Sequence, residues 1–316
     1  MKKRKNKINI ILLILLCLYL LSSCYLPGLG ESQSSDGIII TGGNTSERQI
    51  ISEISAQMIK HYMPEEEVTI INNLGSSVLA VQAIERGEAN IASVMYTGTS
   101  LTGELGLAST TNPNEAMCMV KQGYLEKYDA KWLNSFGFEN TYAFMITRKL
   151  SEELGITKVS QLEKYAAELD AGVDMSWIER DGDGYRDFLK IYDFDFKKIY
   201  PMEISLVYNA LDSGKMDVVL GYTTDGRIDT FDLIVLEDDK HLFPPYDACP
   251  VLTNSILEDY PELENIYGKL IGQIDTLTMQ KLNRQSDEEL IEPYNVARIF
   301  LEENNYFENV DAVSIY

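Results

Sequence analysis

One short unit occurs twice in this chain, and the repeat limits the folds available to it more than any other feature. Residues 81–87 followed by residues 90–97 read as a helix, a glycine that ends it, and a strand finishing in Tyr-Thr. Residues 207–214 followed by residues 217–223 show the same order. Because glycine often ends helices and alternating helices and strands favour α/β sheets, the repeat predicts two similar α/β lobes. A chance match is the alternative, since helix-glycine-strand units are common in α/β proteins.

Each copy of the repeat carries a tyrosine at the end of its strand, Tyr96 in the first and Tyr222 in the second. Ligands of open α/β sheets bind beyond the carboxyl ends of the strands. We therefore expect these two tyrosines to face one another across a cleft between the lobes.

The segment before the first copy supports the α/β class. Residues 38–41 form an apolar strand pattern, and a Gly-Gly-Asn turn leads into a helix that begins near Ser46. Ser46 is followed three residues later by Gln49, a capping-box pattern typical of a helix start. A second strand pattern, residues 68–71, leads into another helix. This alternation predicts a mostly parallel sheet.

Two stretches read as connections between the lobes. Strand patterns at residues 132–138 and 142–147 flank Gly137 and Asn140 and predict a first crossing. Residues 231–251 contain three prolines and predict the return crossing.

These connections divide the chain into lobes. We expect residues 37–140 and 230–316 to form the first lobe and residues 141–229 the second, with helices after Leu252. A two-lobed body crossed twice by the chain has the form of a solute-binding protein, whose lobes close around a ligand by hinge motion.

The amino terminus has the pattern of an export signal. Five basic residues and no acidic ones precede an apolar run at residues 10–21, which predicts a signal peptide over residues 1–23. The run ends in Leu-Ser-Ser-Cys, which resembles the lipobox of bacterial lipoproteins and predicts lipidation of Cys24. Residues 24–36 are then a flexible tether on the extracytoplasmic face of the membrane. An uncleaved anchor is the alternative, but a 12-residue helix cannot cross about 30 Å of hydrocarbon.

Charge and reactive residues favour binding over catalysis. With 49 acidic against 27 basic residues, the net charge of −22 repels nucleic acid. The sequence has no Gly-x-Ser-x-Gly elbow, no phosphate-binding glycine loop and no metal-ligand spacing, so we expect no catalytic residue, metal or cofactor. Residues 181–187 match half of a calcium loop, but tyrosine occupies two later ligand positions, which favours a polar turn. Cys118 and Cys249 could pair, although isolated cysteines of this kind are more often free.

Tyrosine is unusually frequent, at 19 residues against 10 phenylalanines and 2 tryptophans. Several converging tyrosine rings can hold a quaternary ammonium ion by cation–π attraction, whereas such a cation offers no N–H to a hydrogen-bonding pocket. Most tyrosines are ordinary half-buried residues. Four stand out by position: Tyr96 and Tyr222 end the repeated strands, and Tyr142 and Tyr246 lie in the two predicted crossings.

Several further motifs occur together in the order of a known family. The chain resembles the substrate-binding lipoproteins of osmoprotectant ABC transporters, the glycine betaine, carnitine and choline binders of the OpuC and OpuB type. The resemblance covers nearly the whole mature chain and is carried by Asn-Leu-Gly-Ser at 73–76, Tyr-Thr-Gly at 96–98, Leu-Thr-Gly at 101–103, Gly-Phe-Glu-Asn-Thr-Tyr-Ala-Phe at 137–144, Ser-Gly-Lys-Met-Asp at 213–217, Thr-Asp-Gly-Arg at 224–227 and Phe-Pro-Pro-Tyr-Asp at 243–247.

The resemblance implies a type II periplasmic-binding-protein fold with two crossovers and a ligand cleft between the lobes. It implies a monomer that delivers quaternary ammonium solutes to an ABC permease and its ATPase subunit. The four tyrosines of such binders cage the trimethylammonium group, and the ligand's other end meets polar residues. By position, the resemblance assigns the cage to Tyr96, Tyr142, Tyr222 and Tyr246 and the polar contacts to Asn44 and Thr99.

Two positions bear on ligand choice. Asn44 is shorter than the glutamine of relatives that bind betaine and carnitine. Thr99 matches the broad-specificity members, whereas choline-restricted relatives carry an aspartate there. We therefore expect zwitterions such as glycine betaine and carnitine, with choline as a further candidate. The alternatives are a sensory lipoprotein, a choline-restricted binder and a surface enzyme acting on choline-bearing substrates.

Overall fold

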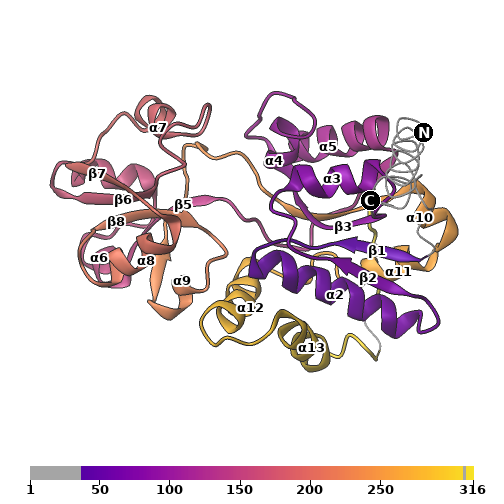
Figure 1. The fold of residues 1–316 in the computed structure, drawn as a ribbon. Coiled ribbons are helices and arrows are strands. Elements are labelled where there is room, and N and C mark those ends of the chain that lie inside the picture. Colours follow the sequence, from indigo (N-terminus) through magenta and orange to yellow (C-terminus); the bar gives the residue numbers. More distant parts are fainter. Residues whose placement is uncertain (1–36, 309–310) are drawn as a thin grey trace, which may run out of the picture.

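The computed structural model describes residues 37–308 and 311–316, and its strands form two five-stranded sheets in two separate lobes (Figure 1). The predicted signal peptide, Cys24 and the tether over residues 24–36 lie outside the described residues. Within the described part of the chain, every helix is too short or too polar to span a membrane.

The first lobe is built on a sheet covered by helices on both faces. Helices α2, α11, α12 and α13 contribute to the core on one face, and helices α3 and α5 to the core on the other. In sheet order the strands are β2 (Val68–Ile71), β1 (Ile38–Thr41), β3 (Ile91–Tyr96), β10 (Ala248–Thr253) and β4 (Ala130–Trp132). The helices of this lobe are α2 (Ser46–Tyr62), α3 (Ser77–Glu85), α4 (Thr97–Thr102), α5 (Pro113–Tyr128), α10 (Asn254–Asp259), α11 (Glu262–Gly268), α12 (Thr276–Asp287) and α13 (Pro293–Glu303).

The second lobe is smaller and has the same layered plan. Its sheet order is β7 (Lys198–Met202), β6 (Asp170–Asp174), β8 (Val218–Tyr222), β5 (Tyr142–Thr147) and β9 (Leu233–Val235). The covering helices are α6 (Arg148–Leu154), α7 (Tyr185–Tyr192), α8 (Ile204–Asp212) and α9 (Arg227–Thr230), with 3-10 turns η1 (Val159–Lys164) and η2 (Ala166–Glu168).

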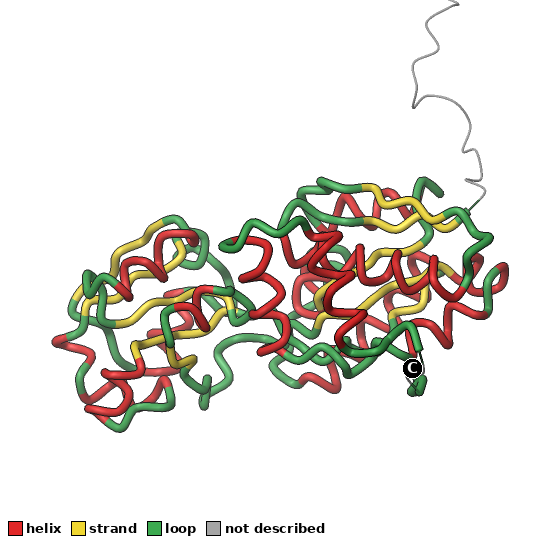
Figure 2. The backbone as a smooth tube through the Cα atoms, turned by 90° about the horizontal axis from the view of Figure 1, so that it is seen from below, coloured by secondary structure: helices red, strands yellow, loops and turns green. Residues whose placement is uncertain are grey.

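The two sheets have the same topology, which confirms the two lobes predicted from the repeat. In each, the second strand in the order (β1 or β6) pairs in parallel with both neighbours. The third strand (β3 or β8) then pairs antiparallel with a strand (β10 or β5) that continues from a crossing. The repeated helices and strands are α3 and β3 in the first lobe and α8 and β8 in the second. Two crossing segments join the lobes at a narrow waist (Figure 2).

Two details of the sequence prediction are wrong. The sheets are mixed rather than mostly parallel, because the chain enters each from a crossing and its strand runs opposite to the neighbour. The second lobe also extends beyond 229: β9 pairs with β5, and Leu242 and Phe243 are buried in the same core. Strand β9 has only three residues, too few to show the alternation of a strand, so residues 233–235 were expected in the first lobe.

The start of helix α2 is close to the prediction. The helix begins at Ser46, but the capping residue is Thr45, whose hydroxyl accepts a hydrogen bond from the backbone N–H of Arg48 at 3.4 Å. Gln49 donates instead to the carbonyl of Gly43 at 3.2 Å. Cys118 and Cys249 are both free, the first exposed and the second buried.

Candidate functional site

A cleft of about 380 Å³ lies between the lobes and contains five of the six predicted ligand-binding residues. These are Tyr96, Thr99, Tyr142, Tyr222 and Tyr246. Asn44 is exposed and does not line the cleft. The remaining lining residues are Thr45, Ser46, Glu47, Arg48, Asn140, Thr141, Arg180, Thr224, Asp225, Asn283 and Asp287.

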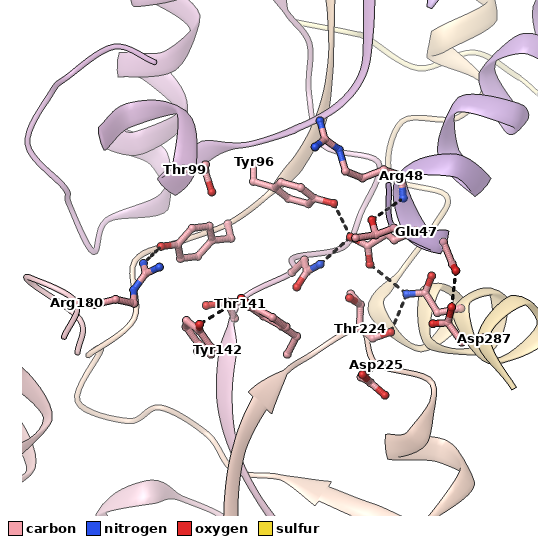
Figure 3. A pocket seen from close by; sticks show the side chains of 16 residues that line it. Glu47, Arg48, Tyr96, Thr99, Thr141, Tyr142, Arg180, Thr224, Asp225 and Asp287 are labelled. Carbon is pink, nitrogen blue, oxygen red and sulfur yellow. Dashed lines mark hydrogen bonds between the residues drawn. The ribbon is translucent and has the colours of Figure 1, made fainter. Parts of the chain in front are cut away.

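On the first-lobe side, a buried carboxylate holds Tyr96 in place. The Tyr96 hydroxyl donates to Glu47 Oε1 at 2.5 Å (Figure 3). Asn140 donates to the same oxygen at 2.8 Å, and Asn283 donates to Oε2 at 3.1 Å. Burial and the nearby charge of Glu47 raise the pKa of Tyr96 well above its usual value. The ring is therefore neutral and held rigidly at the end of β3.

On the second-lobe side, two tyrosines form a stacked pair. Tyr142 begins β5 and Tyr222 ends β8, and the two are directly opposite in the antiparallel register. Their ring centroids lie 4.7 Å apart at an interplanar angle of 21°. The Tyr222 hydroxyl donates to Tyr142 at 3.2 Å, and the Tyr142 hydroxyl donates to the buried Asp174 at 2.5 Å. Burial is the main cause of a raised pKa in both rings.

Tyr246 comes from the return crossing and touches both lobes. Arg180 of the second lobe donates to the Tyr246 hydroxyl at 2.7 Å and forms a bidentate ion pair with Asp183. A Cβ at Gly98, at the start of α4 in the first lobe, would lie only 2.9 Å from the Tyr246 ring. Glycine at 98 therefore lets the ring approach that closely. Burial raises the pKa of Tyr246 to about 12.

The threonines of the two Tyr-Thr pairs clamp the crossings. Thr97 Oγ1 donates to the Pro245 carbonyl at 2.9 Å and accepts from the backbone N–H of Asp247 at 3.0 Å. In the second lobe, Thr223 Oγ1 donates to the Glu139 carbonyl at 2.8 Å and accepts from the Thr141 N–H at 3.1 Å. Each Tyr-Thr pair thus provides one ring to the cleft and one clamp on a crossing.

Helix α12 connects the first lobe to the second beside the cleft. Asn283 donates to the Thr224 carbonyl at 2.8 Å while it also holds Glu47. Gln280 donates to the Thr223 carbonyl at 2.7 Å, and Arg284 pairs with Asp229 of α9 at 2.7 Å. The carboxylate that positions Tyr96 is therefore in the same hydrogen-bond network as the second lobe.

Comparison with known proteins identifies the family of this chain. The sequence model of OpuAC, described as the substrate binding domain of ABC-type glycine betaine transport system, matches residues 36–303. The chain belongs to this family.

Two curated relatives and one solved structure place the chain within the family. The carnitine transport binding protein OpuCC of Listeria monocytogenes serotype 1/2a (strain 10403S) is 47% identical over 98% of this chain and 99% of its own length. A glycine-betaine-binding protein of Pseudomonas aeruginosa is 32% identical over 91% of this chain and 93% of its own. The crystal structure of a glycine betaine/carnitine/choline ABC transporter matches with a TM-score of 0.84 at 46% identity, covering 86% of this chain and 100% of that one. These matches confirm the predicted type II binding-protein fold and the predicted family.

Three residues that organise the cleft carry no recognisable signal in the sequence. Glu47, Arg180 and Asn283 lie far along the chain from the tyrosines that they contact or position. An acidic residue in the first turn of a helix is ordinarily explained by the helix dipole, so Glu47 gave no distinct signal. Among the residues that the structure describes, no cluster of His, Cys, Asp and Glu is suited to a metal ion.

Proposed function

We propose that this protein is the extracytoplasmic binding subunit of an osmoprotectant ABC importer and that it binds quaternary ammonium solutes in the cleft between its lobes. Glycine betaine and carnitine are the favoured ligands, with choline as a further candidate. Tyr96, Tyr142, Tyr222 and Tyr246 surround the cationic group, and Thr99 contacts the ligand's other end.

The observation that carries this proposal is the convergence of four tyrosines from both lobes and from a crossing on one cleft. The Arg180 guanidinium lies 5.4 Å from the centroid of the Tyr142 ring. That ring face therefore accommodates a cation in this structure, at a distance typical of cation–π attraction. All four rings have raised pKa values caused mainly by burial, so they are neutral and keep their electron-rich faces.

Closure is the second part of the proposal. Because the cage takes rings from both lobes, a ligand between them favours the closed arrangement by contacting both sides. The closed form then delivers the solute to a permease driven by an ATPase. We propose that Cys24 carries the lipid anchor and that the protein is a monomer without enzymatic activity, as expected for a transport binding protein. The sensory alternative predicts the same cleft, and a neighbouring permease and ATPase gene distinguishes the two.

Isothermal titration calorimetry with glycine betaine, carnitine and choline tests the proposal. We expect saturable binding of at least one of the zwitterions to the purified protein. Binding of an uncharged sugar or an ordinary amino acid, with none of the three quaternary ammonium compounds binding, contradicts it.

A further inference from the structure

We propose that Arg48 recognises the carboxylate of a zwitterionic ligand and selects quaternary ammonium solutes that carry a carboxylate over those that lack one. This inference rests on the proposed function, because it assigns a residue to the end of the ligand that the tyrosines do not hold. It replaces Asn44, which lies outside the cleft.

The position and the missing partners of the Arg48 guanidinium support this proposal. Arg48 is in the first turn of α2 and lines the cleft, with its side chain partly buried. Its Nε atom is buried and makes no hydrogen bond, and no carboxylate of the described residues lies within ion-pair distance of its head. In Figure 3 no dashed line reaches its guanidinium. A buried donor without a partner is costly, which favours an acceptor supplied from outside the chain.

The other cation of the cleft is already neutralised. Arg180 forms two hydrogen bonds to Asp183 at 2.8 Å each and a third to the Tyr246 hydroxyl. These contacts outweigh the effect of burial and raise the pKa of Arg180. Arg180 is thus committed to positioning Tyr246, whereas Arg48 forms no ion pair with any residue that the structure describes.

The carboxylates of the cleft also have their own partners. Glu47 accepts from three side chains, and Asp225 forms a bidentate pair with Arg227. Asp287 accepts from the Ser46 hydroxyl. None of these acids is paired with Arg48, so a ligand carboxylate would not displace an existing ion pair.

Gly43 gives the arginine its place. A Cβ at position 43 would lie 2.6 Å from both Cβ and Cδ of Arg48 and 2.9 Å from its Nε. The stem of Arg48 therefore lies directly against the backbone at Gly43, and any larger residue there would push it away. Packing against Gly43 therefore fixes the direction of the Arg48 side chain without an ion pair to another residue.

A guanidinium is suited to this role because its planar N–H groups match the two oxygens of a carboxylate. The positive end of the dipole of α2, which begins at Ser46, adds to the attraction for an anion. Glycine betaine and carnitine present such an anion, whereas choline presents a neutral hydroxyl. The contribution of Arg48 therefore depends on the ligand's carboxylate and not on its trimethylammonium group.

The test is calorimetry of Arg48→Met with glycine betaine, carnitine and choline. Methionine keeps an unbranched stem against Gly43 and removes the charge. We expect the dissociation constants for glycine betaine and carnitine to rise by about tenfold or more, as for the loss of a charged hydrogen bond. The dissociation constant for choline, which is a net cation, should stay the same or fall, because the variant removes a like charge from the cleft. Arg48→Lys should recover part of the lost affinity for the zwitterions.

Two further variants make the result specific. Gly43→Ala should displace the Arg48 stem and weaken the binding of glycine betaine and carnitine selectively. Arg298→Met, which changes an exposed arginine on α13, should leave the affinities for all three ligands unchanged. Equal weakening for all ligands, or unchanged zwitterion affinity in Arg48→Met, overturns the inference while the proposed function stands. If the unmodified protein binds no quaternary ammonium compound, the proposed function fails and this inference fails with it.

Discussion

The two lobes share one sheet topology but hold their tyrosines in different ways. In the second lobe, Tyr142 and Tyr222 stack on each other, and their hydroxyl chain ends on Asp174 of the same lobe. In the first lobe, Tyr96 stacks on no other ring of the described residues, and its anchor Glu47 is shared with a crossing residue and with α12, which reaches the second lobe. The second lobe thus carries a self-contained aromatic platform, whereas the ring of the first lobe is tied to the contact between lobes.

This difference suggests a division of work. The stacked pair is complete within one lobe, so in the proposed binding mode it contributes its rings without any residue of the first lobe. Tyr96 and Tyr246 lie on the first lobe and on the crossing, so under the same proposal they reach the cationic group only when the lobes close. Ligand affinity should therefore depend most on the stacked pair of the second lobe. The coupling between ligand binding and lobe closure should depend most on Tyr96 of the first lobe.

The largest losses of ligand affinity should come from two single substitutions, one removing a ring of the second lobe and the other a ring of the first. Tyr142→Ala removes a cage ring and also the stacking and hydroxyl partner of Tyr222, so its affinity loss should exceed that of Tyr96→Ala. For Tyr96→Ala we expect a loss of about 2 kcal/mol, or about thirtyfold, as for one desolvated cation–π partner. Calorimetry with glycine betaine measures both.

A matched control for these variants is Tyr294→Ala, since Tyr294 is exposed on α13 away from the cleft. The affinity of this variant for glycine betaine should equal that of the unmodified protein. A larger loss in Tyr96→Ala than in Tyr142→Ala would reverse the proposed ranking of the lobes.

A smaller effect should come from the two threonine clamps. Valine has nearly the shape of threonine but no hydroxyl, so Thr97→Val and Thr223→Val each remove two hydrogen bonds to a crossing. Thr97 is fully buried and Thr223 is partly exposed, so water can replace the lost bonds only in the second lobe. We expect Thr97→Val to lower the free energy of unfolding by about 2 kcal/mol and Thr223→Val by about 1 kcal/mol.

Urea denaturation without ligand measures these changes. Thr69→Val, at an exposed position on the edge strand β2, should be close to neutral. Equal losses for the two clamp variants would show that the burial of the clamps does not set their strength.

The sequence was most informative where a local pattern repeats. The Tyr-Thr strand ends predicted two lobes and two cleft residues, because a strand end shows itself in a few adjacent residues. It was less informative about boundaries and anchors. The short strand β9 has no visible period, and the role of Glu47 depends on Asn140 and Asn283, which only the folded chain brings to it. Arg180 lies beside a segment that reads as a polar turn, and nothing local indicates its contact with Tyr246.

The most direct test of the central claim compares glycine betaine with 3,3-dimethylbutanoate, in which a carbon atom replaces the cationic nitrogen. The two anionic ends are the same, and the two bulky ends have nearly the same shape, so the comparison isolates the positive charge among the four tyrosines. Our account predicts that calorimetry will show binding of the carbon compound to be weaker by at least about thirtyfold, because it cannot engage the ring faces as a cation. Equal affinity for the two compounds would contradict the claim that this cleft recognises a quaternary ammonium ion.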